Sequence, residues 1–121
     1  GGFEIAAMAG FYLGAASQRK PVILDGFISS AAALIAQILC PQVSQYMIAA
    51  HRSAEIGHGM MLETLGLRPL LNLDFRLGEG TGAAMSFPIF DAARSMLTDV
   101  ATFEEAQVSD KVSTTPAKTH V

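Results

Sequence analysis

Short apolar runs alternate with helix-like segments along this chain, and no other feature constrains its fold as strongly. The apolar runs lie near residues 22–25, 45–50 and 70–73, and each has the length of a buried strand. Stretches rich in Ala, Leu and Met, which favour helices, surround them at residues 3–17, 26–39, 53–66 and 82–106. Strands that alternate with helices are typical of an α/β layer with a parallel sheet. We therefore expect three parallel strands with flanking helices.

The composition indicates that this layer is part of a larger domain. The chain has 121 residues, of which half are hydrophobic and only 16% are charged. Three strands make a narrow sheet, and the first predicted element is a helix. We therefore expect residues 1–107 to form the C-terminal portion of a Rossmann-like α/β domain that lacks its N-terminal strands. Residues 108–121 are polar, rich in Ser and Thr and without periodicity, so we expect a disordered tail there.

Charge and apolar patterning argue against several classes of partner. The net charge is −3 and there is no basic block, so nucleic acid is not an expected partner. No apolar run reaches the roughly 18 residues of a membrane span, and the first residues lack the basic region of a signal peptide. Cys40 is the single cysteine, which excludes an internal disulfide and fits a cytoplasmic location. Its apolar surroundings predict a small buried residue rather than a nucleophile.

Polar residues gather where the three predicted strands end. The stretches are LDGFISS, AAHRSAEIGH and LDFRLGEGTG, and each combines Gly or Ser with an acid or a histidine. Ligands bind outside the carboxyl ends of parallel strands, so we expect one site built from all three. In the first stretch, Asp25-Gly26 and Ser29-Ser30 can present N–H groups and hydroxyls to a phosphate at a helix N-terminus. A capped helix after an ordinary turn explains the same residues equally well.

A metal site is a second possibility in the middle stretch. His51, Glu55 and His58 have the spacing i, i+4 and i+7, which would place them on one face of a continuous helix. Ser53 and Gly57 argue against that continuity, because they predict a transition from strand to helix. A helix cap with polar contacts at the rim is therefore the favoured interpretation of these residues.

The third stretch places one carboxylate, Glu79, between Gly78 and Gly80. Glycines leave space beside the acid, and Leu77 can supply an apolar wall. Partial desolvation there would make Glu79 a better proton acceptor, which suits a general base. The alternative is a solvated acid that caps the following helix. The stretch lacks the Lys-Ser/Thr pair of a P-loop, so a nucleoside triphosphate site is not predicted.

Long stretches of the sequence resemble the C-terminal part of nicotinate-nucleotide–dimethylbenzimidazole phosphoribosyltransferases. The similarity runs over residues 1 to 109, through GGFEIAAMAGFYLGAA, PVILDGFISSAAALIA, AAHRSAEIGHGMMLETLGLRPLLNLDFRLGEGTGAAM and DVATFEEAQVS. These motifs are long and occur in the order found in the family. The resemblance implies an enzyme that moves phosphoribose from nicotinate mononucleotide to 5,6-dimethylbenzimidazole, giving α-ribazole 5′-phosphate and nicotinate for the lower ligand of cobalamin. It also implies a homodimer that requires no metal and no organic cofactor.

The resemblance also assigns roles to individual residues. The glutamate of the family's RLGEG motif, here Glu79, would be the general base. Leu77 would line the benzimidazole pocket, and Gly78 beside it would also bind substrate. Gly26 of DGF and Ser53 of HRSAE would lie on the nucleotide side, near phosphate and ribose. Two other functions stay open at this point: a truncated, non-catalytic nucleotide-binding or dimerisation module, and a metal-dependent hydrolase.

Overall fold

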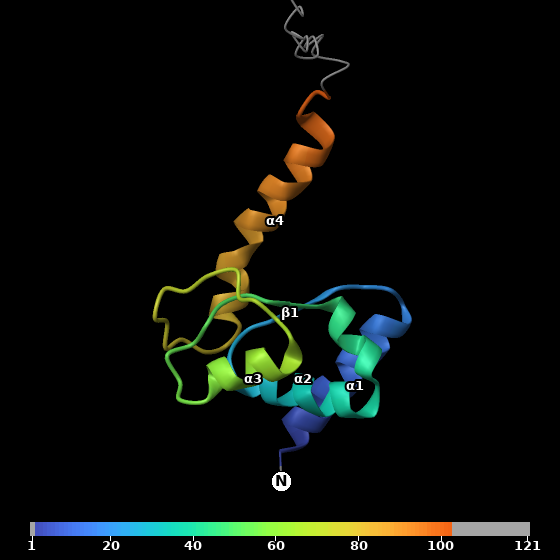
Figure 1. Cartoon of the computed structure of the whole chain (residues 1–121), viewed down its shortest axis with the longest axis vertical. Helices are drawn as coiled ribbons and strands as arrows, with labels where there is room; N and C mark the ends of the chain where they lie inside the picture. Colours follow the sequence, from blue (N-terminus) through green and yellow to red (C-terminus); the bar gives the residue numbers. More distant parts are fainter. Residues whose placement is uncertain (1, 103–121) are drawn as a thin grey trace, which may run out of the picture.

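The computed structural model describes residues 2–102, which form an α/β layer around a small parallel sheet (Figure 1). In chain order the elements are α1 (Phe3–Ser17), β1 (Val22–Leu24), α2 (Phe27–Leu39), the 3₁₀ helix η1 (Pro41–Tyr46), β2 (Met47–Ala49), α3 (His58–Leu65) and α4 (Thr81–Asp99). The predicted alternation of helices and parallel strands is thus confirmed. No helix of these described residues is both long and apolar enough to cross a membrane.

The sheet consists of β1 and β2, which pair in parallel with Ile23 opposite Ile48. The third predicted strand, at 70–73, is only partly confirmed, because it forms a single parallel bridge between Leu71 and His51. Pro69 has no N–H to offer before this bridge, and Asp74 turns the chain into the left-handed region with a φ of 53°. The extended segment is therefore too short to count as a strand.

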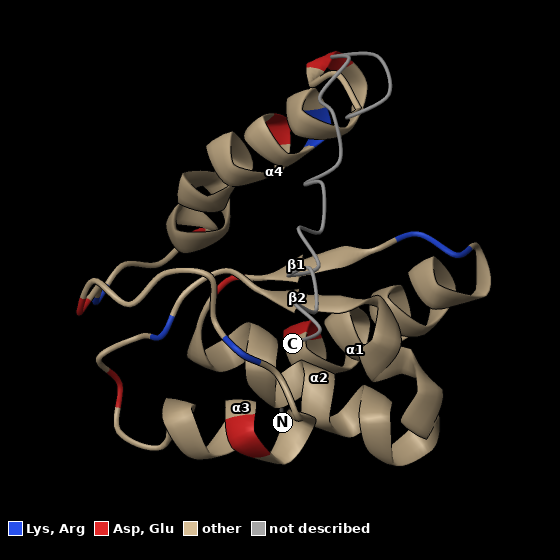
Figure 2. Cartoon of the chain, turned by 45° about the horizontal axis from the view of Figure 1, so that its top comes forward, with Lys and Arg blue, Asp and Glu red and all other residues tan. Residues whose placement is uncertain are grey.

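Helices α1, α2 and α3 cover one side of the sheet, and α4 lies on the other side (Figure 2). Three alanines of α2 are fully buried: Ala32, Ala33 and Ala36. Their small side chains let this helix approach the sheet closely, and Leu24 of β1 and Tyr12 of α1 fill the space around them. The hydrophobic core therefore lies between the sheet and these three helices.

Helix α1 packs through a different face from the one its sequence suggests. The small residues Ala6, Gly10 and Gly14 predict a surface for close helix packing, but all three are exposed. A β-carbon at Gly10 or Gly14 would meet nothing within 4 Å. The buried residues of the helix are Ala9 and Tyr12 instead, because Tyr12 reaches across to α2.

Two other predicted boundaries are wrong. The helix expected at 53–66 begins only at His58, because Gly57 adopts a φ of 92° and residues 54–57 form a bend followed by a turn. The helix expected at 82–106 ends at Asp99, with Val100 already extended. The predicted disordered tail, residues 108–121, lies outside the described residues. Gly66 does end α3 in the left-handed conformation that its place in the sequence predicts.

Candidate functional site

The three polar stretches meet in one pocket at the carboxyl end of the sheet. The pocket has a volume of about 710 Å³, and Gly26, Ser53, Leu77, Gly78 and Glu79 all line it. These are the five residues to which the family resemblance assigned roles, and they come from three separate segments of the chain. The structure therefore brings these five residues together in one pocket. It does not by itself assign a role to any member.

One wall of the pocket is apolar and comes from α1 and the start of α2. Met8, Phe11 and Tyr12 project from α1, and Phe27 and Ile28 from α2. Burial, together with the negative charge of Asp25, raises the pKa of Tyr12 to about 12. The phenol is therefore neutral near pH 7, and its hydroxyl donates a hydrogen bond to the Ser29 carbonyl at 3.3 Å. This wall suits a flat aromatic ligand better than a charged one.

The floor of the pocket begins with Asp25-Gly26, directly after β1. The Gly26 N–H donates to Ser29 Oγ at 2.9 Å, so Ser29 caps α2 as its sequence position predicts. A β-carbon at Gly26 would touch His51 only at an ordinary 3.6 Å. Packing against the protein therefore does not require glycine here, and the bare backbone leaves room on the pocket side.

Asp25 has a contact that the sequence does not reveal. Its Oδ1 accepts a hydrogen bond from the Ala83 N–H at 2.9 Å, across 58 residues of chain. Ala83 is the third residue of α4, where a backbone N–H has no partner inside the helix. One carboxylate oxygen of Asp25 is thus engaged by α4, and this residue is not a simple phosphate cradle. Only a tertiary structure can show such a pairing.

His58 is buried and held by two hydrogen bonds. The Ser53 N–H donates to His58 Nδ1, and His58 Nε2 lies 2.9 Å from Ser30 Oγ. Because Nδ1 accepts, Nε2 carries the proton and donates to the serine. Burial, together with the nearby His51 and Arg52, lowers the pKa of His58. The neutral ring therefore joins α2 and α3 to the Ser53 loop.

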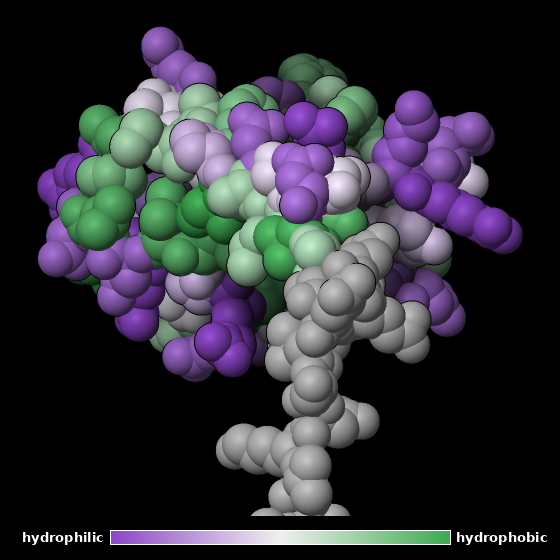
Figure 3. All heavy atoms as spheres, turned by 90° about the horizontal axis from the view of Figure 1, so that it is seen from above, coloured by the Kyte–Doolittle hydropathy of each residue, from purple (hydrophilic) through white to green (hydrophobic). Residues whose placement is uncertain are grey.

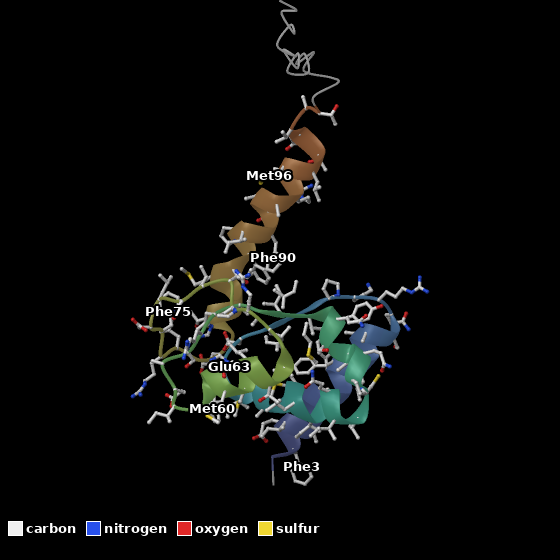
Figure 4. The ribbon with its side chains drawn as sticks, viewed as in Figure 1. Phe3, Met60, Glu63, Phe75, Phe90 and Met96 are labelled. Carbon is white, nitrogen blue, oxygen red and sulfur yellow. The ribbon has the colours of Figure 1, made fainter. Side chains whose placement is uncertain are left out.

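His51 is equally buried, yet neither of its ring nitrogens has a hydrogen-bond partner among the described residues. The ring packs between Phe75 and His58, with centroid distances of 6.0 and 6.2 Å. Figure 4 shows Phe75 on the loop beside the sheet edge. The sequence suggested a metal ligand or, preferably, polar contacts at the rim of a helix cap for His51, and neither predicts this packed, unpaired ring.

The suggested metal site is not assembled. Within residues 2–102, no group of three His, Cys, Asp or Glu side chains is placed to hold an ion. Both nitrogens of His58 are engaged, as described above, and Glu55 pairs with Arg76 Nε at 3.3 Å. The bend and turn at 54–57 replace the helix that would have aligned His51, Glu55 and His58. Cys40 is only partly buried, not enclosed as expected, and its Sγ lies 3.4 Å from Gln42 Oε1.

Glu79 lies in a tight turn that projects from the sheet edge. The Thr81 N–H and hydroxyl both donate to the Gly78 carbonyl, at 3.1 and 2.7 Å. Glu79 and Gly80 have φ angles of 58° and 78°, as in a type I′ turn. The Glu79 side chain is exposed, so the partial desolvation expected from the sequence is not provided by the described residues. A bound ligand would have to supply it.

This arrangement defines an α/β protein with a ligand pocket at the carboxyl edge of a parallel sheet. The chain belongs to the phosphoribosyltransferase family, whose model matches residues 1–108. It is 61% identical over 109 residues to the nicotinate-nucleotide–dimethylbenzimidazole phosphoribosyltransferase of Syntrophotalea carbinolica. That alignment covers 90% of this chain and 31% of the relative. The Chlorobium chlorochromatii protein of the same name is 56% identical over 112 residues, which are 93% of this chain and 32% of that protein.

Solved structures show the same likeness. The crystal structure of this phosphoribosyltransferase from Thermus thermophilus matches with a TM-score of 0.84 and 48% sequence identity. The match covers 91% of this chain and 33% of that one. The chain thus spans about a third of the length of the relatives it matches, and its fold agrees closely with that third.

Proposed function

We propose that this chain carries the general base of a phosphoribosyltransferase site and the pocket that binds the aromatic acceptor. The reaction would transfer phosphoribose from nicotinate mononucleotide to 5,6-dimethylbenzimidazole, giving α-ribazole 5′-phosphate and nicotinate. This product is the precursor of the lower ligand of cobalamin. The names of the similar relatives support this reaction. The pocket supports the positions that we assign to the substrates beside Glu79, Gly26 and Ser53.

The observation that carries the proposal is the position of Glu79 on the rim of a largely apolar pocket, together with Gly26 and Ser53. A volume of about 710 Å³ falls within the usual range for small-molecule sites, roughly 300–1,000 Å³. The aromatic and aliphatic wall from α1 and α2 suits a benzimidazole ring. Glycines on both sides of Glu79 let that ring approach the carboxylate edge-on.

The chemistry needs one base and no strong acid. One ring nitrogen of dimethylbenzimidazole attacks C1′ of the ribose, and the bond from C1′ to nicotinate breaks with its electron pair. Nicotinate leaves as a stable, uncharged pyridine nitrogen. The second ring nitrogen of the acceptor bears a hydrogen, and the product would be cationic if it stayed there. Glu79 takes this proton as the new bond forms. Leu77 and Gly78 would flank the acceptor ring, and Gly26 and Ser53 would contact the nucleotide.

The test is nicotinate release from nicotinate mononucleotide in the presence of dimethylbenzimidazole. We would assay this chain and a chimera in which residues 1–108 replace the matching segment of the Thermus thermophilus relative. Glu79→Gln should reduce turnover by about 10²-fold or more, the usual loss for a general base, and leave substrate binding largely intact. Glu63→Gln on α3 is the matched control, because Glu63 is exposed and outside the pocket. Undiminished turnover in the Glu79 variant would rule out this role.

A second function is compatible with the exposure of Glu79 and with the length of the chain. The 121 residues alone would then bind nucleotide or a second copy of the chain without turnover. Binding of nicotinate mononucleotide without nicotinate release by the isolated chain, together with full activity of the chimera, would identify this case.

A further inference from the structure

The turn that carries Glu79 is held mainly by hydrogen bonds between residues of the turn itself. Both bonds from Thr81 stay within the turn, and residues 76–80 are exposed. The ion pair between Arg76 and Glu55 is one link to the rest of the molecule. Its side chains are 70% and 48% exposed, and such surface pairs contribute little. Before the turn, the Ala54 N–H donates to the Phe75 carbonyl at 2.9 Å and ties the chain to the Ser53 loop. After the turn, the position of Glu79 depends on what holds the first turn of α4.

Asp25 makes the direct polar contact there. Its carboxylate accepts from the Ala83 N–H at 2.9 Å, at the positive end of the α4 dipole. A charged acceptor at this place forms a stronger hydrogen bond than a neutral one. Ala83 lies four residues after Glu79, and Asp25 directly follows β1. This bond therefore connects the rigid end of the sheet to the helix that begins at the Glu79 turn.

His51 packs against the same first turn of α4. Gly82 is buried, and a β-carbon there would fall on the His51 ring and lie 2.9 Å from Asp25 Oδ1. The backbone of α4 thus rests directly against the imidazole and the carboxylate. Beyond this first turn, the buried residue of α4 is Ser86, so the helix has few other attachments among the described residues. Figure 1 shows α4 leading away from the rest of the fold.

We propose that Asp25 is a positioning residue for Glu79, acting through the Ala83 N–H and the first turn of α4. This inference rests on the proposed role of Glu79 as the base. Asp25 lines the pocket, but its negative charge would repel a phosphate, and one of its oxygens is already engaged by α4. Its contribution is to hold the Glu79 turn opposite Gly26 and Ser53, so that the carboxylate meets the acceptor ring in a fixed geometry.

Hydrogen exchange in the 121-residue chain tests the structural part. Asp25→Ala should speed amide exchange in residues 78–86 about tenfold or more, the scale for losing a hydrogen bond to a charged group. Asp25→Asn should show a smaller change, because its amide oxygen can still accept from Ala83. Asp91→Ala, which removes an exposed acid farther along α4, should show none. Exchange in residues 27–39 reports whether each variant is folded. Unchanged exchange in 78–86 of a folded Asp25→Ala variant would overturn the proposal.

A double-mutant cycle in the active protein or the chimera tests the link to Glu79. Asp25→Ala should lower kcat about tenfold or more when Glu79 is present, with partial rescue by Asp25→Asn. In the Glu79→Gln background the same change should cost almost nothing further, because residues that act as a unit are not additive. An equal loss in both backgrounds would mean that Asp25 acts elsewhere, and would overturn the proposal. Full turnover of the single variant Glu79→Gln would contradict the proposed function as well. That failure can be told apart from a failure of the Asp25 proposal alone, because Asp25 is unchanged in this variant.

Discussion

Glu79 adopts a backbone conformation that glutamate rarely adopts. Its φ of 58° lies in the left-handed region, which costs an L-residue other than glycine, asparagine or aspartate about 1–2 kcal/mol. The side chain gains nothing visible in return, because it is exposed and no hydrogen bond or ion pair of Glu79 is found among the described residues. Strain of this kind often marks a residue kept for function rather than for stability.

Replacing Glu79 by asparagine should therefore stabilise the fold. Asparagine tolerates the left-handed region, so we expect Glu79→Asn to raise the free energy of unfolding by about 0.5–1 kcal/mol. Glu63→Asn is the matched control, because Glu63 is exposed within α3 and asparagine is the poorer helix former. This second change should lower stability by a few tenths of a kcal/mol. Urea denaturation measures both, and a loss of stability in Glu79→Asn would show that the carboxylate supports the fold.

The first turn of α4 is the element whose packing is least tolerant. Gly82→Ala would drive a β-carbon into the His51 ring and close to Asp25 Oδ1, so the buried ring or the first turn of the helix would have to shift. We expect a loss of about 2 kcal/mol or more, at the upper end for overpacking. Gly10→Ala is the opposite case, since its β-carbon meets nothing within 4 Å and alanine favours a helix by about 0.5–1 kcal/mol. The unfolding temperature should therefore fall in Gly82→Ala and rise in Gly10→Ala. Equal shifts in the two variants would contradict the contact with His51.

The elements of this fold differ in how far the sequence could predict them. Apolar runs and turn residues were enough to predict β1, α1, α2 and the glycine that ends α3, because these depend on local pattern. They also predicted that the three polar stretches would meet, since the ends of neighbouring parallel strands lie at one edge, and residues of all three line the pocket. The sequence could not show that Asp25 bonds to Ala83 or that His51 underlies Gly82, because these contacts depend on how distant segments pack. The late start of α3 and the short third strand were missed because single turn residues, Gly57 and Asp74, override the apolar pattern.

At the scale of the whole molecule, large apolar side chains remain exposed on two sides. Phe3 and Phe11 on α1 are 90% and 65% exposed, and Met96 and Leu97 on α4 are 67% and 88% exposed. Figure 4 shows Phe3 and Met96 at opposite ends of the structure. Seen from the α4 end, hydrophobic patches lie between polar ones (Figure 3). Surfaces of this kind on a small protein usually mark interaction sites.

We therefore expect the 121-residue chain to self-associate in solution. Burial of such side chains is favourable by roughly 25 cal/mol per Å² of apolar area, and this is the driving force that we expect for the association. Sedimentation velocity should show species larger than the 12.8 kDa monomer at that concentration. The double substitution of Met96 and Leu97 by lysine should shift them toward the monomer, because it removes apolar area and adds repulsion on α4. Ala93→Lys adds charge at another exposed position of the same helix and should have the smaller effect. A compact monomer at all concentrations in the unmodified chain would show that these surfaces do not associate with each other.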